Sequence, residues 1–205
     1  MDQKEQYRRA IEVLREGGVA AIPTDTVYGL IAVATDDGAV RRVFEIKGRA
    51  ADQPLPLFVG SIEQAEIIGE ATDAARLLAG RFWPGPLTIV VPKSSAYHTL
   101  ASAGADTIGL RVPDDPALRE IATQLGPLTA TSANRSGEPE CRSAAEVRAQ
   151  LGDAVDVIVD APVGRDARAS TVVDCTDPRG VRILREGAIE RATIAEALAG
   201  VSALI

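Results

Sequence analysis

VAAIPTDTVYGL, residues 19–30, joins a uniformly apolar run to a cluster of hydroxyl and carboxylate side chains. Residues 19–22 are all apolar and stop at Pro23, which is typical of a short buried strand. Before them, Gly17-Gly18 ends a helix that the apolar spacing predicts over residues 3–16. Polar side chains just beyond a strand lie where α/β folds bind ligands. The residues after Thr26 are expected to form a helical turn.

Predicted helices and strands alternate in this way to the end of the chain, which predicts an α/β fold around one twisted sheet. Turn residues 178–180 join the last two strands as neighbours, which favours a mixed sheet. With no internal repeat or linker, residues 1–205 are expected to form a single domain, and Thr193 is expected to cap the last helix. Further helices are predicted over residues 37–46, 62–68, 72–82, 116–125, 144–151 and 193–198, and further strands over 54–59, 87–91, 107–112, 128–131, 155–159, 171–174 and 181–184.

Composition limits the classes of function. The 205 residues are 46% hydrophobic and 25% charged, as in soluble globular proteins. No apolar run is long enough to cross a bilayer and the polar N-terminus is not a signal peptide, so a cytoplasmic location without a membrane partner is expected. The net charge of −7 disfavours non-specific binding of nucleic acid, although basic residues gathered in a cleft can still bind a small polyanion.

Several common sites are not supported by the sequence. Cys141 and Cys175 are far apart and outside any CxxC pattern, which argues against a disulfide framework or a zinc site. The single histidine, His98, lies in a polar stretch, so catalysis is expected to proceed without a histidine base. Neither GxxxxGK[ST] nor GxGxxG is present.

Three segments gather hydroxyl, cationic and glycine residues that neither a core nor a plain turn requires: PTDTVYGL (23–30), IKGR (46–49) and TSANRSG (131–137). Gly48 allows a bend that aims Lys47 and Arg49 into one space. The backbone N–H groups of TSANRSG can form an anion nest. Together the segments predict an anion-holding pocket built without a Walker loop.

Each segment also has a structural alternative. Thr24 to Thr26 could cap a helix, Lys47 could complement a helix dipole, and residues 131–137 could form an ST or Asx turn. Arg111 and Arg185, at the ends of apolar strands, either form salt bridges or bind a carboxylate or phosphate. RFWPGPLT, residues 81–88, is interpreted mainly as a rigid turn.

In this order the segments resemble the YrdC/TsaC family, the threonylcarbamoyl-AMP synthases. The matching motifs lie between about residues 18 and 189 and are PTDTVYGL, IKGR, FWPGPLT, TIGLRVP, TSANRSG, STVVD and ILREGAI. The resemblance implies a single YrdC-like α/β domain of the short form, with a twisted, mixed and largely parallel sheet, flanking helices and a concave electropositive cleft.

The resemblance also implies a nucleotidyltransferase reaction. L-threonine, bicarbonate or CO2, and ATP with Mg2+ give threonylcarbamoyl-AMP and pyrophosphate. The product passes to a tRNA threonylcarbamoyl-transferase complex, so direct tRNA binding is expected to be weak or indirect.

Site residues follow from the resemblance motif by motif. Lys47 and Arg49 match catalytic, nucleotide-binding positions, and no protein metal ligand is implied. Gln53 and Phe58 depart from residues common in the family, and Phe58 is interpreted as core. Positions for threonine or its carbamate are Thr26, Arg111, Ser132 and Ser170; positions for ATP are Lys47, Arg49, Thr107, Asn134, Arg142 and Arg185.

Two other classes of function stay open at this point. The first is an RNA-binding or translation-associated protein without synthase activity, which the acidic net charge disfavours. The second is a carbamoyl-transfer domain like that of hydrogenase maturation proteins, whose accompanying modules the sequence does not contain. Residues 164–169 are further expected to form a lid over the nucleotide.

Overall fold

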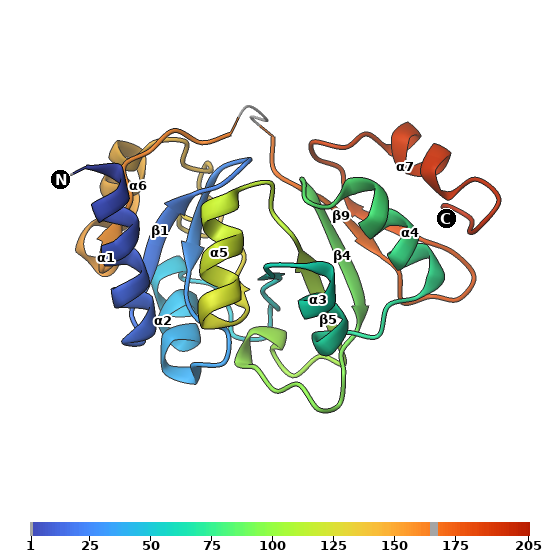
Figure 1. Cartoon of the computed structure of the whole chain (residues 1–205), viewed down its shortest axis with the longest axis horizontal. Helices are drawn as coiled ribbons and strands as arrows, with labels where there is room; N and C mark the ends of the chain where they lie inside the picture. The colour runs from blue at the N-terminus through green and yellow to red at the C-terminus, as the bar shows by residue number, and fades with distance from the viewer. Residues whose placement is uncertain (1, 165–167) are drawn as a thin grey trace.

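The structure is a computed structural model that describes residues 2–164 and 168–205; half of the expected lid, residues 165–167, therefore lies outside the described residues. Two sheets lie side by side, each with its own helices (Figure 1). Helices α1, α2, α5 and α6 pack around the first sheet, and α3, α4 and α7 lie on the second (Figure 1). The helices are α1 (Gln3–Arg15), α2 (Asp37–Lys47), α3 (Ile62–Ile68), α4 (Asp73–Phe82), α5 (Pro116–Leu125), α6 (Ala144–Leu151) and α7 (Arg191–Leu198), with 3-10 turns at Leu100–Ser102 and Gly152–Ala154.

The sheets confirm the α/β class and the mixed strand order, and they correct two details. The sequence predicted one largely parallel sheet, whereas the described strands form two sheets with three parallel and five antiparallel pairs. The first has the order β7-β2-β1-β8, with strands Thr131–Ser132, Tyr28–Ile31, Ala20–Pro23 and Val157–Ile158. The second has the order β10-β9-β4-β5-β3-β6, with strands Arg182–Arg185, Thr171–Asp174, Leu87–Pro92, Thr107–Arg111, Leu57–Phe58 and Leu128–Thr129.

The helical turn expected after Thr26 is wrong, because the chain reverses there. Thr24 Oγ1 donates to the carbonyl of Val27 at 2.8 Å and accepts the N–H of Thr26 at 3.0 Å. These bonds close a tight turn, and the chain returns antiparallel as β2. Thr193 does not cap α7 either, because that helix already begins at Arg191.

The strand expected over residues 128–131 divides between the two sheets. Leu128 and Thr129 pair with β3 of the second sheet, and two residues later Thr131 and Ser132 pair with β2 of the first. Thr129 is fully buried where the sheets meet. Its Oγ1 accepts the N–H of Ala32 at 2.9 Å and donates to the carbonyl of Leu30 at 3.1 Å. The side chain therefore satisfies two buried backbone groups at the end of β2.

Replacing Thr129 by Val should destabilise the fold at this junction. The substitution keeps the shape of the side chain but leaves one buried N–H and one buried C=O without their partner, which costs about 1–3 kcal/mol. Urea unfolding of T129V, compared with the exposed control T123V, measures the difference. Equal unfolding midpoints for the two variants would contradict this role of the hydroxyl.

Candidate active site

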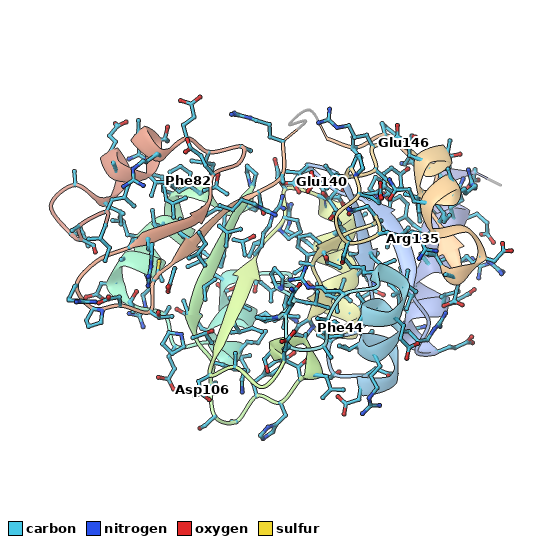
Figure 2. The ribbon with its side chains drawn as sticks, turned by 180° about the vertical axis from the view of Figure 1, so that it is seen from behind. Phe44, Phe82, Asp106, Arg135, Glu140 and Glu146 are labelled. Atoms are coloured by element: carbon cyan, nitrogen blue, oxygen red, sulfur yellow. The ribbon has the colours of Figure 1, made fainter. Side chains whose placement is uncertain are left out.

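A cleft of about 630 Å³ lies between the two sheets. It receives residues from the β1–β2 turn, the end of α2, strands β3, β4, β5, β9 and β10, and the segment after β7. Its lining includes four cationic side chains and one carboxylate, namely Lys47, Arg49, Arg111, Arg185 and Glu140. Figure 2 shows Glu140 between the two halves of the molecule, on the side that faces away from the viewer in Figure 1.

Lys47 is the last residue of α2, and only 4% of it is exposed. Gly48 follows at φ 60°, in the left-handed region, and ends the helix. The Nζ of Lys47 donates to the carbonyls of Ser132 at 2.6 Å and Asn134 at 2.9 Å. Because an ammonium has three N–H groups, one remains for a ligand within the described contacts.

The pKa of Lys47 is lowered to about 8, mainly because burial removes water from the ammonium. The charge of Arg49 lowers this pKa further, and the charge of Glu140 opposes the shift. Lys47 is therefore largely a cation at neutral pH, yet close enough to its pKa that a bound anion changes its protonation.

Arg49 lies beside Lys47 and holds the loop before β3. Its Nε donates to the carbonyl of Gln53 at 3.2 Å, and its Nη2 donates to that of Pro54 at 3.1 Å. Both acceptors are neutral backbone groups, so the positive charge is not cancelled. Gln53 thus contributes a backbone carbonyl to Arg49, which does not depend on the side chain at that position.

Arg111 ends β5 and is buried at the base of the cleft. Its Nη2 forms an ion pair with Asp25 Oδ1 at 2.6 Å, and its Nε donates to the carbonyl of Gly85 at 3.0 Å. Its Nη1 lies 3.5 Å from Thr26 Oγ1, and the Phe58 ring lies 5.5 Å from Cζ. Phe58 is buried, as expected of a core residue, and its ring also covers one face of a site residue.

On the same sheet as Arg111, Arg185 of β10 holds Ser170 in place. Its Nη2 donates to the Ser170 carbonyl at 2.9 Å and to Ser170 Oγ at 3.1 Å. Ser170 Oγ lies 3.0 Å from Thr88 Oγ1, so the two hydroxyls share one hydrogen bond. The hydrogen of the other hydroxyl is then available to a ligand.

Asn134 presents an acceptor without a partner. Its Nδ2 donates to the carbonyls of Arg135 at 2.9 Å and Glu138 at 2.7 Å, which fixes the turn after β7. Its buried Oδ1 has no hydrogen-bond partner among the described residues. A buried unpaired acceptor is costly, and a ligand donor in the cleft would satisfy it.

The structure brings most of the predicted site residues together around this cleft. Arg142 is the exception: it is exposed and not among the lining residues, and its backbone N–H donates to Glu146 Oε2 at 2.6 Å. Glu146 lies at α6 in Figure 2, away from the middle of the molecule. The predicted site residues that line the cleft are Thr26, Lys47, Arg49, Thr107, Arg111, Ser132, Asn134, Ser170 and Arg185.

Sequence reasoning assigned no site role to several residues here. Thr88 belongs to the motif interpreted as a turn; its hydroxyl, at the second position of an otherwise apolar strand, was the available signal. Asp25 was visible as a carboxylate after β1, but its pairing with Arg111 joins residues 86 positions apart. Glu140 had no signal beyond its closeness to TSANRSG.

The fold and the site define a class: a mixed α/β domain with a cation-lined cleft between two sheets. The chain belongs to the Sua5/YciO/YrdC family, whose model, described as "Telomere recombination", matches residues 12–187.

Named relatives agree with this membership. The chain is 42% identical to the threonylcarbamoyl-AMP synthase of Pyrococcus abyssi, over 90% of this chain and 54% of that protein. It is 40% identical to the Bacillus subtilis threonylcarbamoyl-AMP synthase, over 95% of this chain and 57% of that protein, so it spans little more than half of either. The solved structure of P. abyssi Sua5 complexed with L-threonine matches with a TM-score of 0.90 and 37% identity, over 100% of this chain and 60% of that one.

Binding of a polyphosphate near Lys47 should take up a proton at about pH 8. The free amine has a pKa of about 8, and a bound anion raises it by favouring the ammonium. Affinity for ATP, whose phosphates are already ionised at this pH, should therefore fall as pH rises from 7.5 to about 9.5.

Calorimetry in buffers of different ionisation enthalpy measures the proton uptake directly. The K47M variant should show weaker binding and no uptake in this range. Equal uptake by the wild type and K47M would assign the titration to another group.

Proposed function

We propose that the protein is an L-threonylcarbamoyl-AMP synthase, a nucleotidyltransferase that forms threonylcarbamoyl-AMP and pyrophosphate from L-threonine, bicarbonate or CO2, and ATP. The observation that carries the proposal is the cleft itself, whose lining gathers the cations Lys47, Arg49, Arg111 and Arg185 together with several hydroxyl side chains. The names of the P. abyssi and B. subtilis relatives, and the threonine bound to P. abyssi Sua5, support it.

The chemistry requires charge screening more than proton transfer. The threonine amine adds to CO2 and loses a proton to give a carbamate. A carbamate oxygen then attacks the α-phosphorus of ATP, and the bond to the β,γ-pyrophosphate breaks. Because this nucleophile is already anionic, the second step needs no strong base. The obstacle is the meeting of a carbamate, a carboxylate and a triphosphate in one cleft.

The proposed roles divide the residues of the cleft between the two substrates. Lys47, Arg49 and Arg185 screen the phosphates and stabilise the charge that develops on pyrophosphate. Arg111 binds the threonine carboxylate, with Thr26, Ser132 and Ser170 around the carbamate. Thr107 and Asn134 contact the nucleotide from the lining, and Arg142 remains a proposed nucleotide contact outside it.

Mg2+ enters this proposal as part of the substrate. Among the described residues, no group of three His, Cys, Asp or Glu side chains could hold a metal ion. Glu140 is the carboxylate among the lining residues. Such a donor set suits Mg2+ that the ATP phosphates carry, since Mg2+ at nucleotide sites binds through one or two carboxylates and the phosphates.

The product is proposed to pass to a separate tRNA threonylcarbamoyl-transferase complex, with weak or indirect contact to tRNA. Within the described chain no helix is long and apolar enough to cross a membrane. We place the reaction in the cytoplasm, where ATP and tRNA are found.

Omission of each substrate in turn tests the proposal. Purified protein with MgATP, L-threonine and bicarbonate should release pyrophosphate, and removal of any one of them should abolish the release. Pyrophosphate release that ignores threonine would contradict it. Tight, salt-sensitive tRNA binding without pyrophosphate release would favour an RNA-binding protein instead.

K47A and R49A should each lower the rate at least about a hundredfold, equivalent to about 2.7 kcal/mol in the transition state. Each removes one cation from the site where charge develops on pyrophosphate. R41A, an exposed residue of the same helix, is the control and should keep full activity. Circular dichroism checks that the variants are folded; near-normal turnover in K47A or R49A would refute the phosphate assignment.

A further inference from the structure

We propose that Asp25 is a positioning residue that holds the guanidinium of Arg111 in the orientation that binds the carboxylate of the amino-acid substrate. The inference rests on the proposed function, because it takes threonine as that substrate. Asp25 is not among the residues that line the cleft, so it acts through Arg111 and not on the substrate.

The pair joins the two sheets at the base of the cleft. Asp25 lies in the turn between β1 and β2 of the first sheet, and Arg111 ends β5 of the second. Their side chains are only 11% and 5% exposed, and Nη2 and Oδ1 are 2.6 Å apart. Neither is in the solvent-screened setting in which ion pairs contribute little.

Among the described contacts of the Arg111 guanidinium, Asp25 is the charged partner. The carbonyl of Gly85 holds Nε, and Thr26 Oγ1 lies at 3.5 Å from Nη1, too long for a strong hydrogen bond. The Phe58 ring restricts one face of the guanidinium but does not fix its rotation in the plane. The short bond to Asp25 therefore fixes the direction of the remaining N–H groups.

Asp25 is itself held firmly. The Thr24 hydroxyl closes the turn around it through the backbone of Thr26 and Val27. On the other side the N–H of Gly164 donates to the Thr24 carbonyl at 2.8 Å. A Cβ on Gly164 would lie 2.5 Å from the backbone oxygen of Asp25, so the two backbones are in close contact. A carboxylate on such a turn has little freedom to follow a moving guanidinium.

Charge and geometry predict opposite effects of Asp25 on substrate binding. The negative charge of Asp25 offsets the cost of burying Arg111, but it also repels a second carboxylate at the same guanidinium. Its acceptor atom aligns the guanidinium, which favours binding. If Asp25 assists binding, it does so by position, and the two contributions can be separated by substitution.

Two substitutions at Asp25 separate the contribution of its charge from that of its geometry. D25E keeps the charge and displaces the acceptor by one methylene; D25N keeps the acceptor in place and removes the charge. We expect D25E to raise the Kd and KM for L-threonine about tenfold or more, and D25N to stay within about threefold of wild type. For both, the Kd and KM for ATP should change less than about twofold, since neither Asp25 nor Arg111 is assigned to the phosphates.

D114E and D114N are the matched controls, because Asp114 pairs with Arg119 on the surface at 3.5 Å, and both should bind threonine as the wild type does. Thermal unfolding of each variant checks that it is folded. Where one Asp25 variant does not fold, the threonine affinity of the other variant tests the positioning role. Wild-type affinity in D25E, or equal losses in D25E and D25N, would overturn the positioning role. A wild type that neither binds threonine nor releases pyrophosphate with it would instead refute the proposed function.

Discussion

The cleft depends on one short segment that changes sheets. Between Leu128 and Ser132 the chain leaves β3 and joins β2, and the buried hydroxyl of Thr129 satisfies the backbone at that step. The two walls of the cleft belong to different sheets, so their separation is set where these sheets meet. Ser132 then presents its carbonyl to Lys47, which means that the same segment also positions the ammonium. The segment that joins the two sheets is thus also part of the site.

The cations of the cleft are satisfied mainly by neutral groups. Lys47, Arg49 and Arg185 donate to backbone carbonyls in the contacts described, and Lys47 also lies at the negative end of the α2 dipole. Carbonyl dipoles offset part of the cost of burying a cation without cancelling its charge. A chain with a net charge of −7 can therefore keep a cluster of uncancelled cations in one cleft. Arg111 differs, because a carboxylate holds it.

Local sequence patterns predicted the positions of helices and strands better than they predicted which strands and side chains pair. Apolar spacing and end signals located helices such as α2 and α5 closely, because helices are made of contacts within the segment. Of the ten residues that the motif resemblance assigned to the site, nine line the cleft and Arg142 does not. The hairpin at Thr24, the second sheet and the Asp25–Arg111 pair were missed. The second sheet and the ion pair depend on contacts between distant segments, which no single stretch of sequence encodes. The hairpin is local, but its turn, closed by the Thr24 hydroxyl, was interpreted as the start of a helix.

The distribution of counter-ions suits the two proposed substrates. A triphosphate carries several negative charges, and the cations assigned to it, Lys47, Arg49 and Arg185, have neutral acceptors as their described partners. Threonine is a zwitterion with no net charge, and the cation assigned to its carboxylate already forms an ion pair with Asp25. The cations without a described carboxylate partner are thus assigned to the more highly charged substrate, and the paired cation is assigned to the substrate without net charge.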